Sequence, residues 1–313
     1  MSSFAVPKDR WQPDLSNRLA DVLAEIGDAF GRFAERRVCG SWQGPSHLLP
    51  AARYSLLAGG KRLRPALVVL SAYATTDRPP ATGDQLLSIA AAVEMIHTYS
   101  LIHDDLPCMD NDDRRRGAPT CHVVHGVPDA TWAGTALLVG AFGSLSRGFS
   151  GTSRIPVAAR VLGASAGLVG MVGGQWLDTE LPGSGAPRAA FSEVHERKTS
   201  ALIAGCCALG GLASSADDTT LDILHDYGRS LGLAFQAVDD LLDVTGDAEV
   251  MGKRAGKDAA AGKLTALAAL GLDGAKRYAD EMAARASACV APLGGPATPL
   301  LQELTAYLGR RGH

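Results

Sequence analysis

Two clusters of aspartates, each placed directly after a long apolar segment, most constrain what this chain can fold into. The first cluster is Asp104, Asp105 and Asp110 in HDDLPCMDNDD, and the second is Asp239, Asp240 and Asp243 in FQAVDDLLDVTGD. Carboxylates at the edge of an apolar interior repel one another and lose hydration unless cations lie between them. Oxygen ligands without a neighbouring His or Cys cluster favour Mg²⁺, which completes its shell with phosphate oxygens and water. One such cluster alone is also typical of a solvated acidic loop, but two together favour a magnesium and phosphate site.

The spacing within the clusters sets how each can present its carboxylates. Asp239 and Asp243 are four residues apart, about 40° around a helix, so they share one side. Asp104 and Asp110 are six apart, roughly 120° off a common face, and Pro107 lies between them. They can converge only if the helix ends near Leu106 and the chain loops back.

The rest of the chain has helical periodicity. The segment from Leu87 to Ile102 is apolar around most of its circumference, which indicates a central helix. Further helices are expected at 14–37, 47–57, 64–76, 131–147, 156–178, 191–213, 219–244, 262–270, 274–292 and 298–309. Glycine and proline clusters between them are typical of short turns. We therefore expect one all-α domain over residues 1–313, a bundle around a central cavity, with residues 1–14 as a loose tail.

Composition bears on other classes of protein. A net charge of −3 gives no overall electrostatic case for nucleic acid binding, although a local basic patch stays open. The uncharged stretches 130–146 and 161–177 fall short of the roughly 20 strongly apolar residues of a membrane span. The N-terminus lacks the apolar core of a signal peptide, so we expect a cytoplasmic protein.

Basic residues accompany both acidic clusters. Arg114, Arg115 and Arg116 follow the first, and a glycine turn with three cations, GGKRLRP at 59–65, lies upstream. Further cations are Lys198, Lys253, Lys257 and Lys263. Any single one is typical of a solvated helix end, but arginine forks and lysine charges beside magnesium ligands indicate a pocket for diphosphates.

These motifs resemble those of the trans-isoprenyl diphosphate synthases, especially the bacterial farnesyl diphosphate synthase type. The matching stretches are RYSLLAGGKRLRP, IHTYSLIHDDLPCMDNDD, GGQWLD, KTSALI, LGLAFQAVDDLLDVTGD and GKRAGKD, spread from residue 53 to about residue 265. The resemblance implies the all-α isoprenoid synthase helical bundle, commonly a homodimer. It also implies a prenyltransferase that joins isopentenyl diphosphate to an allylic diphosphate, with Mg²⁺ and no organic cofactor.

The resemblance assigns roles to individual residues. Three Mg²⁺ on the allylic diphosphate would be held by Asp104, Asp105, Asp110, Asp239 and Asp243. The same diphosphate would contact Arg115, Lys198 and Lys253, with Gln175 nearby. Isopentenyl diphosphate would bind at Gly60, Lys61, Arg64, His97 and Arg116. Thr199 and Gln236 would lie beside the reacting carbon.

Product length depends on Tyr99, the fifth residue before the first aspartate, which by resemblance forms the floor of the chain pocket. A bulky floor there favours the C15 product, farnesyl diphosphate; C10 and C20 products, and simple core packing of Tyr99, stay open. The chain departs from the family pattern at Arg114, Thr135, Trp176 and Ala266-Leu267. A tryptophan in place of a small residue is expected to add volume near the pocket.

Two other functions compete with this one. A terpene cyclase shares the bundle and the first aspartate motif, but it needs no second diphosphate site such as GGKRLRP. A non-catalytic partner subunit would lack aspartates from one cluster, whereas both clusters are complete here.

Overall fold

The computed structural model describes residues 13–310, except for residues 16, 80, 182–189 and 246–263. Most of the expected tail, together with Lys253, Lys257 and Lys263, lies outside the described residues. Within the described part, helices dominate and the strands are a two-residue pair, β1 (Arg114–Arg115) and antiparallel β2 (Ala118–Pro119). The expected all-α fold is confirmed.

The helices follow the turns expected from glycine and proline. In chain order they are α1 (Leu19–Phe33), α2 (Leu48–Leu57), α3 (Leu63–Thr75), α4 (Gly83–Asp104), α5 (Cys121–His125), α6 (Val127–Gly148), α7 (Ile155–Ala166), α8 (Met171–Glu180), α9 (Ala190–His195), α10 (Ala201–Ala213), α11 (Asp218–Thr245), α14 (Ala266–Val290) and α15 (Thr298–Arg310). Three short helical segments adjoin these helices. Two are π-helical, η1 (Ala34–Val38) and η3 (Glu196–Ser200), and one is a 3₁₀-helix, η2 (Cys39–Ser41). Because η3 joins α9 to α10, the expected helix 191–213 is continuous.

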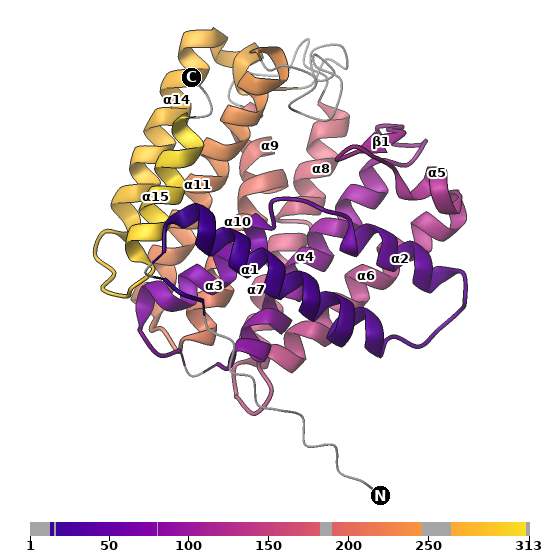
Figure 1. Cartoon of the computed structure of the whole chain (residues 1–313). Helices are drawn as coiled ribbons and strands as arrows, with labels where there is room; N and C mark the ends of the chain where they lie inside the picture. Colours follow the sequence, from indigo (N-terminus) through magenta and orange to yellow (C-terminus); the bar gives the residue numbers. More distant parts are fainter. Residues whose placement is uncertain (1–12, 16, 80, 182–189, 246–263, 311–313) are drawn as a thin grey trace, which may run out of the picture.

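Helix α4 is the central element, as its apolar circumference predicts. It begins at a capping box in which Thr82 and Gln85 satisfy each other's backbone N–H groups, and it ends at Asp104. It packs against α3, α6 and α10 and lies behind α1 in Figure 1. Helix α6 approaches closely because Gly148 has no side chain; a Cβ there would strike Ile89 of α4.

Three expected helices are divided differently from the prediction. The expected helix 156–178 breaks between α7 and α8, where Gly167 takes an extended conformation with φ −85° and ψ −154°. The expected helices 262–270 and 274–292 join as α14 across a kink at Gly271, which has φ 72°. A left-handed φ of this kind suits glycine, so a single residue both links and bends the two segments.

Two segments are long and apolar enough to cross a membrane by length and composition alone, Gly83–Asp104 and Ile155–Glu180. The apolar window of the first is 78% buried within the bundle, which is typical of a core helix. That of the second is 28% buried, and the segment is interrupted between α7 and α8. The second segment therefore leaves apolar side chains on the surface of the protein.

Candidate active site

The first acidic cluster is shaped by a loop that folds back on the end of α4. The backbone N–H of Asp110 donates to the carbonyl oxygen of Asp104 at 2.8 Å, and Asn111 turns the chain with φ 50°. This is the return that the six-residue spacing requires. The following hairpin carries Arg115 onto Asp105, where its Nε lies 2.9 Å from both carboxylate oxygens and its Nη2 lies 2.6 Å from Oδ1.

Burial sets the electrostatics of this cluster. It raises the pKa of Asp104 to about 6; Lys198 opposes the shift, and Asp110 adds to it. Burial also raises the pKa of Asp105, against the hydrogen bonds from Arg115. Both Lys198 and Arg115 therefore lie within electrostatic reach of the end of α4, as the predicted diphosphate site requires.

Helix α8 and the turn η3 meet beside this cluster. Lys198 Nζ donates to Asp178 Oδ2 at 2.6 Å. Gly174 allows the contact between the two elements, because a Cβ there would overlap the backbone of Lys198. Gln175 lies on the same helix with its Oε1 buried and without a hydrogen-bond partner.

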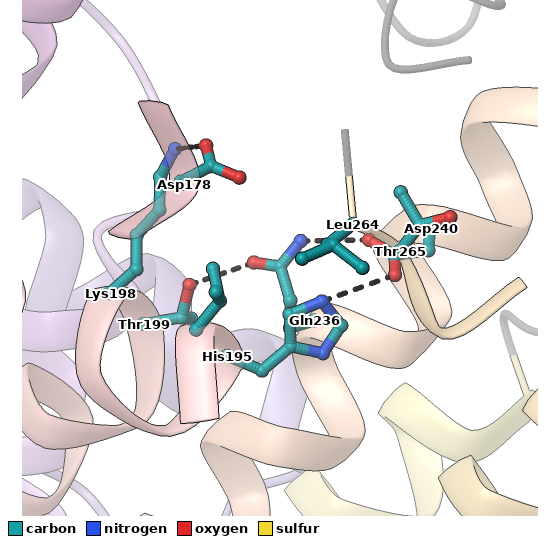
Figure 2. Close-up of a pocket in the computed structure, with 9 residues that line it drawn as sticks. Asp178, His195, Lys198, Thr199, Gln236, Asp240, Leu264 and Thr265 are labelled. Carbon is teal, nitrogen blue, oxygen red and sulfur yellow. Dashed lines mark hydrogen bonds and ion pairs between the residues drawn. The ribbon is translucent and has the colours of Figure 1, made fainter. Parts of the chain in front are cut away.

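The second acidic cluster is connected to η3 by a chain of hydrogen bonds, which Figure 2 shows. Thr199 Oγ1 donates to Gln236 Oε1 at 2.7 Å, and Gln236 Nε2 donates to Asp240 Oδ1 at 2.9 Å. These residues, with Lys198 and Asp178, line a cavity of about 60 Å³. The two residues assigned to the reacting carbon are therefore in direct contact.

The carboxylates assigned to metal in the second cluster lie on the same helix, α11. Asp243 is 2% exposed, whereas Asp239 is half-buried. Burial lowers the pKa of Arg64, and Glu94 and Asp239 oppose that shift. Asp239 is thus within electrostatic reach of a residue assigned to isopentenyl diphosphate.

The residues assigned to isopentenyl diphosphate gather where α3, α4 and the hairpin meet. Arg116 Nη1 donates to the carbonyl oxygen of Gly59 at 2.7 Å, and its Nη2 lies 3.4 Å from His97 Nε2. Gly60 has φ 150°, which favours glycine, and a Cβ there would lie 2.6 Å from Arg116 Nη1 and displace the guanidinium. Burial, with help from nearby arginines, holds the pKa of His97 well below its usual range. His97 is therefore a neutral hydrogen-bonding group. Lys61 is exposed at the same turn.

A buried ion pair holds this turn in place. Arg62 Nη1 donates to Glu94 Oε1 at 2.7 Å, and the two side chains are 10% and 3% exposed. Arg62 also donates to the carbonyl oxygens of Leu56 and Ala58 at the end of α2. The pair therefore fixes the geometry from which Gly60 and Lys61 project.

The departures from the family pattern have modest structural effects. Trp176 is 62% exposed on α8, so its side chain adds its volume at the surface of the bundle and not in the buried core. Arg114 Nη2 donates to the carbonyl oxygen of Gly117 and so stabilises the hairpin turn. Thr135 Oγ1 donates to the carbonyl oxygen of Thr131 within its own helix. Ala266 is buried as the first residue of α14.

Comparison with known proteins decides the family. The family model described as polyprenyl synthetase matches residues 45–292. The chain belongs to the polyprenyl synthetase family. It is 46% identical over 235 residues to farnesyl diphosphate synthase of Escherichia coli (strain K12), covering 74% of this chain and 77% of that protein. It is 39% identical to farnesyl diphosphate synthase of Bacillus subtilis (strain 168) over 96% of this chain and 99% of the relative.

Relatives with a longer product and solved structures give the same family. Geranylgeranyl pyrophosphate synthase of Capsicum annuum is 43% identical over 76% of this chain and 64% of that protein. A geranyltransferase from Helicobacter pylori, solved with magnesium and isoprenyl diphosphate, superposes with a TM-score of 0.77 at 31% identity, covering 93% of this chain and 96% of that one.

In this polyprenyl synthetase, the sequence did not single out Asp178, His195 or a role for Asp240. His195 Nε2 lies 3.3 Å from Asp240 Oδ2, and Asp240 also accepts from the backbone N–H of Ala266 at 2.7 Å. A signal was available for two of them: Asp178 closes the motif GGQWLD, and Asp240 follows Asp239. For His195 the only hint was its position three residues before Lys198 on a helix.

Proposed function

We propose that this protein is a short-chain trans-prenyltransferase that condenses isopentenyl diphosphate with dimethylallyl or geranyl diphosphate, with farnesyl diphosphate as the main product. One observation carries the proposal. Cations lie near the acidic clusters in two groups: Lys198 and Arg115 are within electrostatic reach of Asp104, and Arg64 and Arg116 are within reach of the neutral His97. Two groups suit two diphosphates, whereas a terpene cyclase binds one.

Magnesium is proposed as the cofactor, with three ions per site held by Asp104, Asp105, Asp110, Asp239 and Asp243. Within the described residues, no three acidic, His or Cys side chains already form a metal-binding group. The chemistry of the donors nevertheless fits, because burial and neighbouring carboxylates raise the pKa of Asp104, and a cation would relieve both effects. Asp105 accepts from Arg115 and still has lone pairs to offer, since each carboxylate oxygen has two. When bound, Mg²⁺ would neutralise negative charge accumulating on the departing diphosphate.

The side chains of the protein supply positioning, charge and exclusion of water. Lys198, Arg115, Gln175 and Lys253 are proposed to hold the allylic diphosphate while its C–O bond breaks to leave an allylic cation. Thr199 and Gln236 would lie beside this cation. The double bond of isopentenyl diphosphate then forms the new C–C bond, and one proton is lost, which the released diphosphate accepts. The apolar bundle interior keeps water from the cation.

The five residues assigned to isopentenyl diphosphate would hold it in place for this attack. These residues are Gly60, Lys61, Arg64, His97 and Arg116. A bidentate arginine contact fixes the direction of a diphosphate as well as its position, which a bimolecular reaction of this kind requires.

Product length is proposed to depend on Tyr99. Its side chain is 6% exposed on α4 and lies edge-on to His103, with 5.8 Å between the ring centroids. A buried aromatic ring at this depth would stop the growing chain at C15. C20 and C10 products are the alternatives; relatives named as geranylgeranyl pyrophosphate synthases favour the first of them.

A homodimer is proposed from the exposed apolar surface formed by α6 and by the turn between α7 and α8. Val139 is 68% exposed, Trp132 63%, Leu168 81% and Val169 67%. Such a surface is unusual for a monomer and typical of an obligate subunit interface. Val139→Asp should shift the protein to a monomer in light scattering. The protein is proposed to be cytoplasmic, a single domain, and to bind no nucleic acid.

Product analysis tests the function. Purified protein is incubated with Mg²⁺, isopentenyl diphosphate and either dimethylallyl, geranyl or farnesyl diphosphate, and the dephosphorylated alcohols are sized. The expected result is mainly the C15 alcohol. Cyclic hydrocarbon from an allylic diphosphate alone would instead indicate a cyclase, and no product in any combination would indicate a non-catalytic subunit.

A further inference from the structure

We propose that His195 and Asp240 are positioning residues: together they fix the direction of the hydrogen bonds through Gln236 and Thr199, so that the Thr199 oxygen presents its lone pairs to the reacting carbon. This inference deepens the proposed function and rests on it, because the reacting carbon is placed by that function. Neither residue is among those assigned to metal, to a diphosphate or to the reacting carbon.

Asp240 is the point where the donors converge. It is 3% exposed, and its carboxylate accepts from the backbone N–H of Ala266 and from Gln236 Nε2, while His195 Nε2 lies 3.3 Å from Oδ2. A backbone N–H can only donate, so the carboxylate acts as an acceptor here. The donors come from α9, α11 and the start of α14, and the carboxylate therefore ties together three segments that are distant in sequence (Figure 2).

The direction of the remaining bonds follows from this. Because Asp240 accepts, the carboxamide of Gln236 must turn its nitrogen toward Asp240 and its oxygen toward Thr199. An oxygen facing the hydroxyl forces Thr199 to donate its proton, over 2.7 Å. The free lone pairs of Thr199 are then available to the cavity, where negative electron density would stabilise a developing cation.

His195 is built to support this arrangement. It is 4% exposed and packs edge-on against Phe191, with 5.5 Å between the ring centroids. Burial lowers its pKa to about 4, so the ring is neutral and carries one N–H, which the contact with Asp240 assigns to Nε2. Its Nδ1 is buried without a hydrogen-bond partner, as expected of the unprotonated nitrogen of that tautomer. Burying such a ring is costly, which favours a role in holding Asp240 over simple packing.

The test uses kinetics of the full-length enzyme with saturating Mg²⁺ and both substrates. His195→Phe keeps the ring but removes the donor, and it should lower kcat about tenfold, the effect of one lost hydrogen bond, with both KM values within about twofold of the parent. His195→Gln returns an N–H donor and should recover most of the loss. The matched control is His225→Phe, because His225 is an exposed histidine 4.0 Å from Asp226.

A double variant tests whether His195 acts on kcat through Gln236. In a Gln236→Leu enzyme, the chain from Asp240 to Thr199 is already cut, so adding His195→Phe should cost nothing further in kcat. A full additional tenfold loss in that background would overturn the proposal, as would a parent-like kcat for His195→Phe alone. If the parent makes no prenyl product, the proposed function fails; if the parent is active and His195→Phe matches it, only this inference fails.

Asp240→Asn provides a test that does not depend on folding of the His195 variants. Asparagine offers one acceptor and one donor, so its amide must turn its oxygen to Ala266 and its nitrogen to Gln236. That reverses the chain and should lower kcat at least tenfold, with the Mg²⁺ concentration for half-maximal rate unchanged. A several-fold rise in that Mg²⁺ concentration, equal to the rise in Asp239→Asn, would show that Asp240 is a metal ligand and would overturn the proposal.

Discussion

The two acidic clusters have similar sequences but hold their second aspartate by different means. Asp105 is neutralised by a charged guanidinium from a hairpin, and the side chain of Arg115 is 31% exposed. Asp240 lies in the interior, where uncharged N–H groups of Gln236 and Ala266 donate to it and His195 Nε2 lies 3.3 Å away. In both clusters, N–H groups of the protein donate hydrogen bonds to the second carboxylate.

The difference indicates that the two clusters contribute to the reaction in different ways. A guanidinium that is partly exposed can exchange a carboxylate for a diphosphate, so the first cluster is suited to respond to substrate. Uncharged donors in a buried network have no such alternative partner, so the second cluster is suited to hold a fixed direction. Asp104 and Asp239, the first residues of each cluster, are the ones whose role should be the same.

Removing these first aspartates is expected to have the largest effect on the rate. Asp104→Asn and Asp239→Asn should each lower kcat roughly a thousandfold, because each removes a charge that holds the cation beside the leaving group. The assay is product formation at saturating substrate, and Asp222→Asn, on the exposed face of α11, is the control. A thousandfold loss in one variant with a parent-like rate in the other would show that a single cluster is sufficient.

Substitutions of Arg115 test whether Asp105 requires a charged donor. Arg115→Leu leaves the buried Asp105 without its main donor and should lower kcat/KM for the allylic substrate about tenfold to a hundredfold. Arg115→Lys should recover little, since a lysine cannot bind both carboxylate oxygens at once. Steady-state kinetics with each substrate varied in turn measures this, and an equal loss for isopentenyl diphosphate would contradict the assignment.

Substitution of Tyr99 tests whether its ring closes the end of the chain pocket and so sets product length. Tyr99→Ala should lengthen the main product from C15 to C20, because removing the ring opens the end of the chain pocket. The same change costs about 3 kcal/mol of unfolding free energy through the cavity it leaves. Product sizing and chemical denaturation measure the two effects, with Tyr307→Ala on the exposed face of α15 as the control. Unchanged C15 product would assign Tyr99 to core packing alone.

The smallest effect is expected at His97. Burial and nearby arginines hold its pKa well below the usual range, so the ring is neutral before substrate binds. His97→Gln preserves a neutral hydrogen-bonding group and should change KM for isopentenyl diphosphate only about twofold to fivefold, whereas His97→Leu should raise it about tenfold. Equal values for the two variants would remove His97 from the substrate site.

Sequence patterns predicted the parts of the structure that depend on residues close together in the chain. The apolar circumference before Asp104 gave the central helix, and the six-residue spacing to Asp110 required the loop that the structure contains. The break between α7 and α8 was not predicted, because the apolar pattern continues through the glycines there.

Contacts between distant segments could not be predicted. Arg115 meets Asp105 only because the loop after α4 folds back on the end of that helix, and Arg62 at the start of α3 meets Glu94 of α4. The distance from His195 to Asp240 in sequence carries no spacing signal at all. Such pairs depend on how the helices pack, which no local pattern records.

The central claim is that both acidic clusters face one diphosphate through shared metal ions. Anomalous diffraction from a crystal grown with Mn²⁺ and an unreactive allylic thiodiphosphate tests it most directly. The account predicts metal peaks at the diphosphate that are coordinated by Asp104 and Asp239 together. Peaks at only one cluster, or a diphosphate bound without metal, would contradict it.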